Sequence, residues 1–165
     1  MFRWYEGGAE AGEAAPAAAA PEEAAGGSSE LRVELDQLRA TLDEDPDNAP
    51  ALVRVGDLSF QAGWFAEAIE FYERALAQQP GDAKLMLVIG LCHRQLQQYD
   101  DALDWFDRAE AAAPASWEAT YNRAVVIGVD LGRTDEARQI LDELEKAHPT
   151  ATGLERLREA LQPSS

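Results

Sequence analysis

The sequence predicts an all-α protein built from stacked pairs of helices. Three observations lead to this fold class: an internal repeat of 34 residues, apolar residues at three- and four-residue spacing inside each copy, and a proline that closes each copy. The segments that begin at Ala49 and Ala83 align at their small, aromatic and proline positions. The matched pairs are Gly56 and Gly90, Ala68 and Ala102, Tyr72 and Phe106, Ala75 and Ala109, and Pro80 and Pro114.

A third copy follows and carries one extra residue. Ala124 takes the place of the glycine, and Pro149 lies 35 residues after Pro114 instead of 34. We expect the extra residue at the end of the first helix of this copy, near 128–132. The three predicted copies span about 49–82, 83–116 and 117–151.

Each copy is predicted to hold two amphipathic helices of about 14 residues, called helix A and helix B below. Gly63 and Gly132 are expected to close helix A in the first and third copies, because glycine favours the left-handed conformation that follows a helix. The proline at the end of each copy stops helix B. Asp82 and Ser116 have side chains suited to the N-cap of helix A.

These positions resemble the tetratricopeptide repeat (TPR) family, whose pattern has a 34-residue period with small, aromatic and proline positions. In the same register, residues 29–43 look like a lone helix B, and residues 152–161 like a capping helix. The resemblance implies an α-solenoid of three TPR helix-turn-helix repeats over 29–162, with an N-terminal extra helix and a C-terminal capping helix. The apolar stripes of the two end helices are Leu31, Leu35, Leu38 and Leu42, and Leu154, Leu157 and Leu161.

Residues 7–29 contain only Gly, Ala, Glu, Pro and Ser. Such a composition cannot bury enough apolar surface to offset the entropy of ordering, so 1–28 is predicted to be a disordered, low-complexity segment. Phe2, Trp4 and Tyr5 stand before it. Two interpretations of these aromatic residues stay open: a short motif that docks into a groove or onto a partner, and the frayed start of a shortened gene product.

The composition argues against several classes of partner. The chain has 14 Lys and Arg against 31 Asp and Glu, a formal net charge of −17. This acidity disfavours nucleic acid and anionic membrane surfaces as direct partners. No stretch approaches the about 18 apolar residues of a membrane span. A cytoplasmic location is expected, with a domain tethered through an upstream anchor as the alternative. The Ala- and Arg-rich usage indicates a bacterial genome, and a salt-adapted archaeal source is the alternative that also suits the acidity.

No catalytic or metal-binding constellation is expected. Cys92 and His93 are neighbours on one predicted helix, where successive side chains point about 100° apart and therefore do not face each other. One cysteine and two histidines make a poor metal site, and no glycine-rich phosphate loop is present. The chain is therefore predicted to be no enzyme and to carry no cofactor.

The family resemblance implies a peptide-binding groove lined by positions 2, 5, 6, 9, 12 and 13 of helix A. The expected groove residues are Val53, Arg54, Asp57, Phe60, Lys84, Leu87, Leu91, Arg94, Tyr121, Asn122 and Val125, with Val88 on the same face. Some family members hold chaperone tails with a clamp of Lys, Asn and Arg at five such positions. These positions are here Val53, Asp57, Val88, Glu118 and Asn122, and none of them matches the clamp.

These features predict a non-enzymatic adaptor or scaffold that binds a protein partner, as a peptide or a helix, in the concave groove. Phe60, Leu87, Leu91 and Tyr121 would supply apolar contacts. Arg54, Arg94 and Asn122 would act as polar anchors. Two alternatives stay open: a self-assembling, homo-oligomeric TPR scaffold, and a soluble accessory domain of a membrane-anchored assembly or biogenesis factor.

Overall fold

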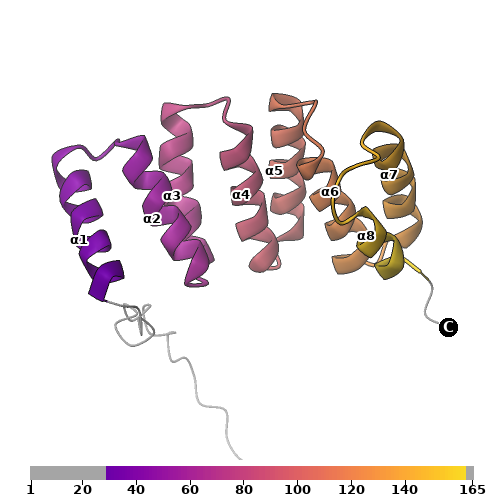
Figure 1. Cartoon of the computed structure of the whole chain (residues 1–165), viewed down its shortest axis with the longest axis horizontal. Coiled ribbons are helices and arrows are strands. Elements are labelled where there is room, and N and C mark those ends of the chain that lie inside the picture. The colour runs from indigo at the N-terminus through magenta and orange to yellow at the C-terminus, as the bar shows by residue number, and fades with distance from the viewer. Residues whose placement is uncertain (1–28, 163–165) are drawn as a thin grey trace, which may run out of the picture.

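The computed structural model describes residues 29–162, and within them every regular element is a helix (Figure 1). The prediction of an all-α solenoid is thereby confirmed, whereas the predicted disorder of 1–28 lies outside the described residues. The elements are α1 (Ser29–Glu44), α2 (Ala49–Gln61), α3 (Phe65–Gln78), α4 (Ala83–Gln95), α5 (Tyr99–Ala112), α6 (Glu118–Val125), the π-helical turn η1 (Val126–Asp130), α7 (Thr134–Ala147) and α8 (Leu154–Ala160).

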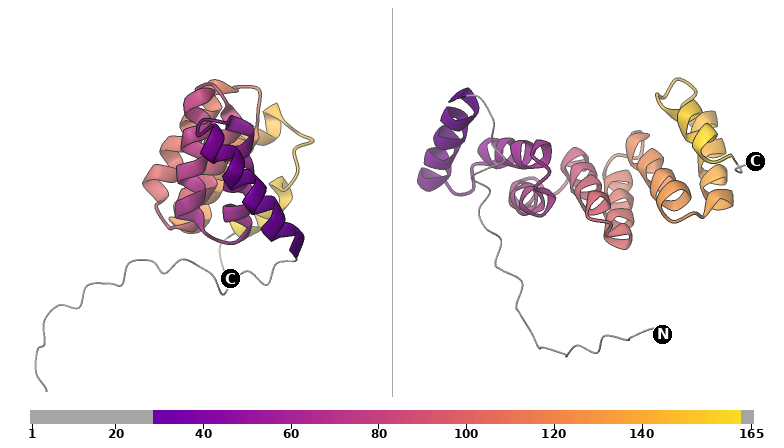
Figure 2. Two further views of the ribbon diagram at one scale, coloured as in Figure 1. Left: turned by 90° about the vertical axis from the view of Figure 1, so that its left-hand side faces the viewer. Right: turned by 90° about the horizontal axis from the view of Figure 1, so that it is seen from below.

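The helices follow one another in a single row, with α1 at one end and the α7–α8 pair at the other (Figure 1). Views from two further directions show that the row twists along its length (Figure 2). In the three predicted copies, helix A corresponds to α2, α4 and α6–η1, and helix B to α3, α5 and α7. Each helix therefore packs mainly on its neighbours in the chain, as expected for a solenoid.

Small residues set the close spacing inside each pair. A Cβ atom added at Gly56 would lie 2.6 Å from Cε1 of Tyr72, and one added at Gly90 would lie 2.6 Å from Cε1 of Phe106. The aromatic ring of helix B thus lies directly against the glycine of helix A. Ala68, at the start of α3, is fully buried in the same interface. The repeating small and aromatic positions in the sequence are the residues that hold each pair together.

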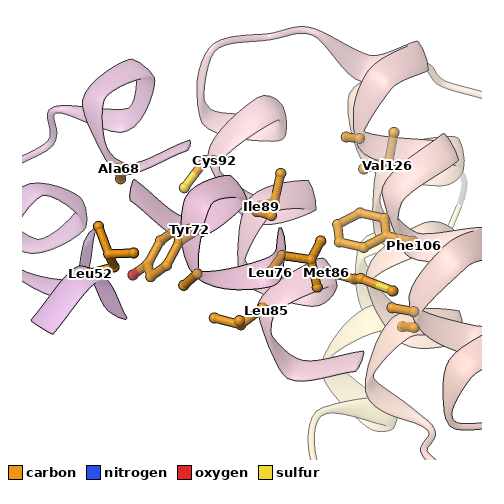
Figure 3. Close-up of a cluster of buried hydrophobic side chains, with 14 residues drawn as sticks. Leu52, Ala68, Tyr72, Leu76, Leu85, Met86, Ile89, Cys92, Phe106 and Val126 are labelled. Carbon is orange, nitrogen blue, oxygen red and sulfur yellow. The ribbon is translucent and has the colours of Figure 1, made fainter. Parts of the chain in front are cut away.

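The core is one continuous cluster of buried side chains along the first two pairs, followed by a second cluster at the C-terminal end. Figure 3 shows Tyr72 and Phe106 at successive places in the first cluster, one repeat apart, with Ile89 between them. Burying side chains of this size stabilises the fold by about 1.5–3 kcal/mol each relative to exposure. The helical spacing of the first copy predicts eight inward positions. Ile69 is only partly buried, and the other seven are buried: Leu52, Val55, Leu58, Ser59, Ala68, Tyr72 and Ala75.

The first and third A–B turns contain glycine in the left-handed conformation, as predicted. Gly63 has φ +80° and Gly132 has φ +69°. The second copy has Gln97 at the corresponding place with φ +60°, a conformation that costs a non-glycine residue free energy. The A–B turn of the second copy thus keeps the left-handed conformation without a glycine, which the sequence pattern did not predict.

One of the two predicted N-caps is correct and the other is wrong. The carboxylate of Asp82 accepts hydrogen bonds from the backbone N–H groups of Lys84 and Leu85, so it caps α4. Ser116 does not cap α6, because that helix begins only at Glu118. The Ser116 hydroxyl instead donates to the Glu118 carboxylate, and this hydrogen bond lowers the pKa of Glu118.

The extra residue of the third copy lies where it was expected, in the π-helical turn η1. The backbone N–H of Leu131 donates to the carbonyl of Val126, five residues earlier, at 2.9 Å. A π-helical turn holds one more residue than an α-helical turn, so the insertion is absorbed within the helix. Gly128 lies in this turn, where an added Cβ would clash with both Ala137 and Leu161.

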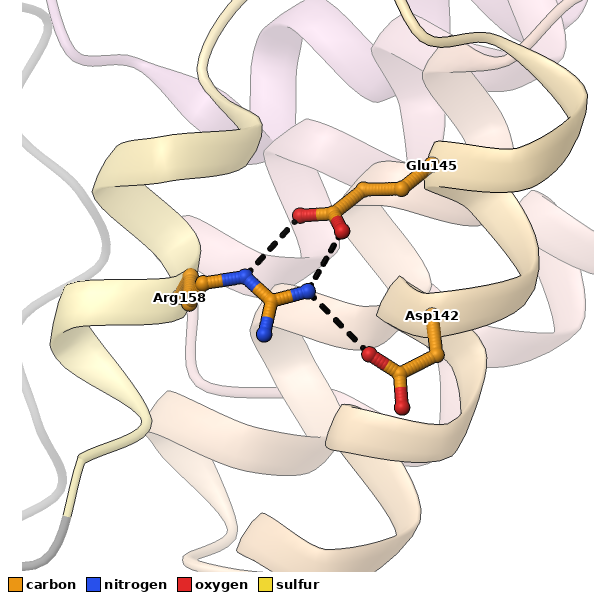
Figure 4. Close-up of polar contacts among 3 residues, drawn as sticks. All are labelled: Asp142, Glu145 and Arg158. Atoms are coloured by element: carbon orange, nitrogen blue, oxygen red, sulfur yellow. Dashed lines mark hydrogen bonds and ion pairs between the residues drawn. The ribbon is translucent and has the colours of Figure 1, made fainter.

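The two end helices differ in how they are held. Leu154, Leu157 and Leu161 of the C-terminal cap are buried against α6–α7. Arg158 of α8 also bridges Asp142 and Glu145 of α7 (Figure 4). By contrast, none of the described side chains of α1, from Val33 on, is buried. The C-terminal end of the array is therefore closed more firmly than the N-terminal end.

Candidate functional site

The predicted groove residues of helix A do not all lie on one side, since Asp57 and Phe60 of α2 contact Tyr72 and Phe65 of α3. On α4, Gly90 lies against Phe106 of α5, and Met86 and Ile89 are buried. At about 100° per residue, Leu87 and Leu91 lie about 60° and 100° around the helix from Gly90, on a flank of α4 beside the buried interface. Both are half-buried, unlike the core residues behind them. The helix periodicity therefore indicates the side of α4 available to a ligand.

Helix A carries half-buried apolar side chains in all three copies. They pack against the core with one edge and leave another edge accessible. We call this set the helix-A strip, and its members are Val53, Phe60, Leu87, Val88, Leu91 and Val125. Phe60 is oriented by an edge-to-face contact with Phe65, with ring centroids 5.4 Å apart. A row of half-exposed apolar residues of this kind is typical of a protein-binding surface.

Arg94 was expected to be a free polar anchor, but it is already paired. Its guanidinium binds Asp130 of η1 with two hydrogen bonds, Nε to Oδ2 at 2.5 Å and a terminal nitrogen to Oδ1 at 3.2 Å. Only 27% of the Arg94 side chain and 17% of the Asp130 side chain are exposed. The carboxylate raises the pKa of Arg94, so this ion pair joins the second copy to the third.

Arg54 is also engaged within the chain. Its Nε atom donates to Oε1 of Glu34 on α1 at 2.5 Å, and this contact lowers the pKa of Glu34. Lys84, in contrast, is exposed, and no ion pair to it occurs within the described residues. Two of the three expected cationic positions are therefore neutralised by carboxylates of neighbouring elements.

The remaining predicted polar positions are likewise occupied. Asp57 accepts a hydrogen bond from the Tyr72 hydroxyl at 2.8 Å, and burial together with this bond raises the pKa of Tyr72. The side-chain amide of Asn122 donates to the carbonyl of Glu118 in its own helix. These two side chains support helix packing and helix geometry as well as lining the face.

Tyr121 lies at the C-terminal boundary of the face. Its ring makes an edge-to-face contact with Trp117, with centroids 5.7 Å apart. Its hydroxyl oxygen would lie 3.0 Å from a Cβ added at Gly153, in the loop that leads to α8. Tyr121 therefore contacts the connection to the capping helix and packs against the C-terminal cluster, whereas Leu87 and Leu91 pack against the first cluster.

Cys92 and His93 are neighbours on α4 and carry the thiol and imidazole groups of this helix. Cys92 is fully buried, and burial raises the pKa of its thiol to about 12, so it is not a thiolate at neutral pH. Nδ1 of His93 lies 2.8 Å from the side-chain oxygen of Gln98. Within residues 29–162, no group of three acidic, His or Cys side chains is arranged to hold a metal ion, and no helix is long and apolar enough to cross a bilayer.

A hollow of about 340 Å³ lies away from the helix-A strip, between α7 and α8. It is lined by Arg138, Leu141, Asp142, Arg158 and Gln162. Both arginines are used in structural contacts: Arg138 donates to the carbonyl of Leu161, and Arg158 binds Asp142 and Glu145. The hollow is therefore part of the joint that attaches the capping helix.

Sequence reasoning missed the partners of Arg54 and Arg94. Glu34 and Asp130 belong to α1 and to η1, neither of which was expected to supply groove residues. The charge pattern held no signal for these pairs, because the position of Asp130 depends on the inserted turn. The cation–π contact of Arg108 with Trp105 on α5, at 3.7 Å from the ring centroid, was also missed.

Comparison with known proteins agrees with the repeat analysis. A family model described as tetratricopeptide repeat matches residues 59–124. The protein described as CTR9 homolog of Arabidopsis thaliana is 42% identical over 59 residues, which is 35% of this chain and only 5% of that protein. The chain therefore spans a small fraction of the length of this relative.

Solved structures share the same architecture. The crystal structure of MamA superposes with a TM-score of 0.67 and 20% identity, covering 77% of this chain and 72% of MamA. The second TPR domain of human RPAP3, solved in complex with the HSP70 peptide SGPTIEEVD, has a TM-score of 0.62 and 21% identity, covering 70% of this chain and 96% of that domain. Residues 59–124 of this chain therefore match the tetratricopeptide repeat family, and the helical array as a whole has the fold of these solved structures.

Proposed function

We propose that the chain is a non-enzymatic protein–protein interaction adaptor that binds a partner peptide or helix on the helix-A strip. The observation that carries this proposal is the strip itself. Leu87, Leu91 and Val125 are only partly covered by the packing of the array. Exposed apolar surface in a row is costly in water unless a partner covers it.

The neighbouring structures support a peptide or helix as the partner. A TPR domain of RPAP3 is described as bound to an HSP70 peptide, and another as bound to the HSP90 peptide SRMEEVD. Both domains share the fold of this chain at 20–21% identity. The fold is thus suited to holding an extended segment, although the residues that touch the ligand differ between chains.

The charges on the strip argue against acidic tails as ligands. Arg54 and Arg94 already bind carboxylates of this chain, so neither guanidinium is free to receive a carboxylate of a partner. Displacing Asp130 from Arg94 would leave a mostly buried carboxylate without its cation. We therefore propose apolar side chains as the main anchors of the partner, with polar contacts at the rim.

A paired pull-down from lysate of the source organism tests the adaptor. The baits are the wild-type chain and L87E/L91E, with A77E/A111E as a matched control that adds two carboxylates on the exposed side of α3 and α5. We expect a protein retained by the wild type and the control but lost by L87E/L91E, because a carboxylate on the strip disfavours apolar contact.

Circular dichroism and thermal melting first establish that all baits are folded. Because Leu87 and Leu91 also pack against the core, K84E/Q95E is a second variant that changes only exposed positions at the edge of the strip. Identical catches from the wild type and both strip variants would contradict binding on the helix-A strip.

A further inference from the structure

The helix-A strip has a definite chemical preference. Its apolar part is formed by half-buried aliphatic side chains and Phe60. Around it lie the carboxylates of Asp57 and Glu118 and the ion pairs of Arg54 and Arg94, with Lys84 as the remaining cation. Carboxylates outnumber cations by one in this set. A complementary ligand therefore has bulky apolar side chains and a positive rather than a negative charge.

One segment of this chain has that chemistry. Phe2, Trp4 and Tyr5 place three aromatic residues within four positions, and Arg3 between them is the only Lys or Arg before residue 29. Residues 6–28 contain no other aromatic or large aliphatic residue. Large rigid aromatic side chains with an arginine are the residue types that most often dominate binding energy at interfaces.

The connection between this segment and the array is long enough to reach the strip. Tyr5 lies 24 residues before Ser29, where α1 begins. A flexible chain of 24 residues has a root-mean-square span of about 25–30 Å. Three successive helix-to-helix spacings, from α1 to α4, amount to about 24–30 Å at 8–10 Å each. The segment can therefore reach Leu87 and Leu91 of its own chain.

We propose that residues 2–5 of this chain occupy the helix-A strip in the absence of a partner, with the aromatic side chains over Leu87, Leu91 and Val88. This inference rests on the proposed function, because it names an occupant of the same surface. The segment then acts as a built-in competitor. A partner must displace it, so the apparent affinity of the strip for any outside ligand is reduced.

The size of the competition follows from the effective concentration. A short flexible connection holds a tethered segment at an effective concentration on the order of millimolar. If the free segment binds the strip with a dissociation constant of about 0.1 mM, tethering weakens an outside ligand by about tenfold. A change of this size is readily measured.

The test uses the full chain and a probe taken from its own sequence. The probe is a synthetic peptide of residues 1–8, labelled with a fluorophore at its C-terminus, and the readout is fluorescence anisotropy. The wild type is compared with full-length F2A/W4A/Y5A. We expect the triple variant to bind the peptide about ten times more tightly than the wild type, because its strip is vacant.

Two variants in the triple-alanine background locate the peptide. Adding L87E/L91E is expected to abolish peptide binding, whereas adding A77E/A111E is expected to leave it unchanged. Backbone amide chemical shifts on peptide addition give a second measurement that does not depend on folding of L87E/L91E, and they should move along α4. Shifts confined to α5 or α7 would overturn the proposal.

Equal affinity of the peptide for the wild type and F2A/W4A/Y5A, or no binding to either, would refute the tethered occupant. This failure is separate from that of the adaptor, since the pull-down with L87E/L91E reports on the strip alone. Sedimentation equilibrium tests whether residues 2–5 dock on a second molecule instead of on their own chain. Concentration-dependent association of the wild type that F2A/W4A/Y5A lacks would place the segment on a second copy and overturn docking within one chain.

Discussion

Single small residues decide how closely the helices of each pair approach. Gly90 lies so close to Phe106 that a Cβ atom added there would be 2.6 Å from the ring carbon Cε1 and 2.8 Å from the ring carbon Cδ1. The ring is fully buried, and its own neighbours restrict its movement. At this position the absence of a side chain is therefore a requirement of packing rather than of backbone conformation.

The substitution G90A is expected to destabilise the protein. Overpacking of this kind costs about 1–3 kcal/mol, partly offset by the about 1 kcal/mol gained in helix propensity. Urea unfolding followed by circular dichroism measures the difference. The matched control is G81A in the α3–α4 turn, where an added Cβ meets no atom within 4 Å. Equal midpoints for G90A and G81A would contradict the packing argument.

The same place in the first and second copies uses different chemistry. Tyr72 donates its hydroxyl to Asp57, whereas the second copy has Phe106 and Leu91 at the corresponding positions. A polar pair in one copy thus replaces an apolar pair in the other, with the ring in the same location against a glycine. Asp57 was predicted as a groove residue because periodicity reports the side of a helix but not its hydrogen-bond partner.

At the scale of elements, the least firmly held helix is α1. Its described side chains are at most half-buried, and Val33 is 54% exposed. In the register of the repeats, Glu34 and Thr41 of α1 correspond to Ala68 and Ala75, which are fully buried in α3. A polar contact, from Arg54 to Glu34, therefore takes the place of close small-residue packing.

This contact predicts a pH dependence of α1. The hydrogen bond from Arg54 lowers the pKa of Glu34 below its ordinary value of 4.5. A carboxylate with a lowered pKa in the folded state contributes stability that is present above pH 4.5 and is lost as pH falls through the lowered value. We expect the protection factors of α1 amides against hydrogen exchange to hold down to about pH 4.5 and to fall below it.

The variant R54Q supplies the comparison for this experiment. Without the guanidinium the pKa of Glu34 is no longer lowered, so the contribution of this pair to the pH dependence of α1 should disappear. Amides of α4 serve as an internal reference in both proteins. A pH response of α1 that is the same in R54Q and in the wild type would assign it to other carboxylates.

The elements of the fold were predictable from sequence, and their junctions only in part. Periodicity and the recurring prolines predicted every helix pair. They could do so because the apolar pattern and the helix-ending residues of each copy favour the same packed arrangement. The extra residue of the third copy was placed correctly near Gly128 for the same reason. The start of α6 was not, because Ser116 bonds to a side chain instead of the backbone.

The candidate site stays a prediction, and the sequence pattern indicates only which helix faces belong to it. The side of helix A that carries Leu87 and Leu91 follows from the 3.6-residue period. The pairing of Arg94 with Asp130 does not, because it joins residues 36 positions apart across two copies and depends on the shape of η1. Contacts between elements need the three-dimensional arrangement, which no local pattern contains.

At the scale of the whole molecule, the array carries its charge unevenly. The exposed charged positions of α3 and α5 are mainly acidic and include Glu67, Glu70, Asp100, Asp101 and Asp104. Arg74 and Arg108 lie over the rings of Phe71 and Trp105 on the same helices. The negative charge of the array is therefore concentrated on helix B, whereas the helix-A strip consists of apolar side chains.

Because each pair contacts mainly its neighbours, damage at one end of the array should stay local. Leu157 of the capping helix is 2% exposed and belongs to the C-terminal cluster with Leu141 and Leu144 of α7. The substitution L157A is expected to cost about 2–4 kcal/mol by leaving a cavity. In a solenoid each repeat contacts only its neighbours, so the adjoining repeat is destabilised most and distant repeats least.

Hydrogen exchange read by mass spectrometry gives the spatial pattern. For L157A we expect faster exchange in α7, α8 and η1, a smaller change in α5, and none in α2 and α3. R158Q is the matched comparison: Arg158 bridges Asp142 and Glu145 in a half-exposed site, where such pairs contribute about 1 kcal/mol or less. Its effect should therefore be much weaker and confined to α8. If L157A instead accelerated exchange equally in α2–α3 and in α7, the molecule would unfold as one cooperative unit rather than repeat by repeat.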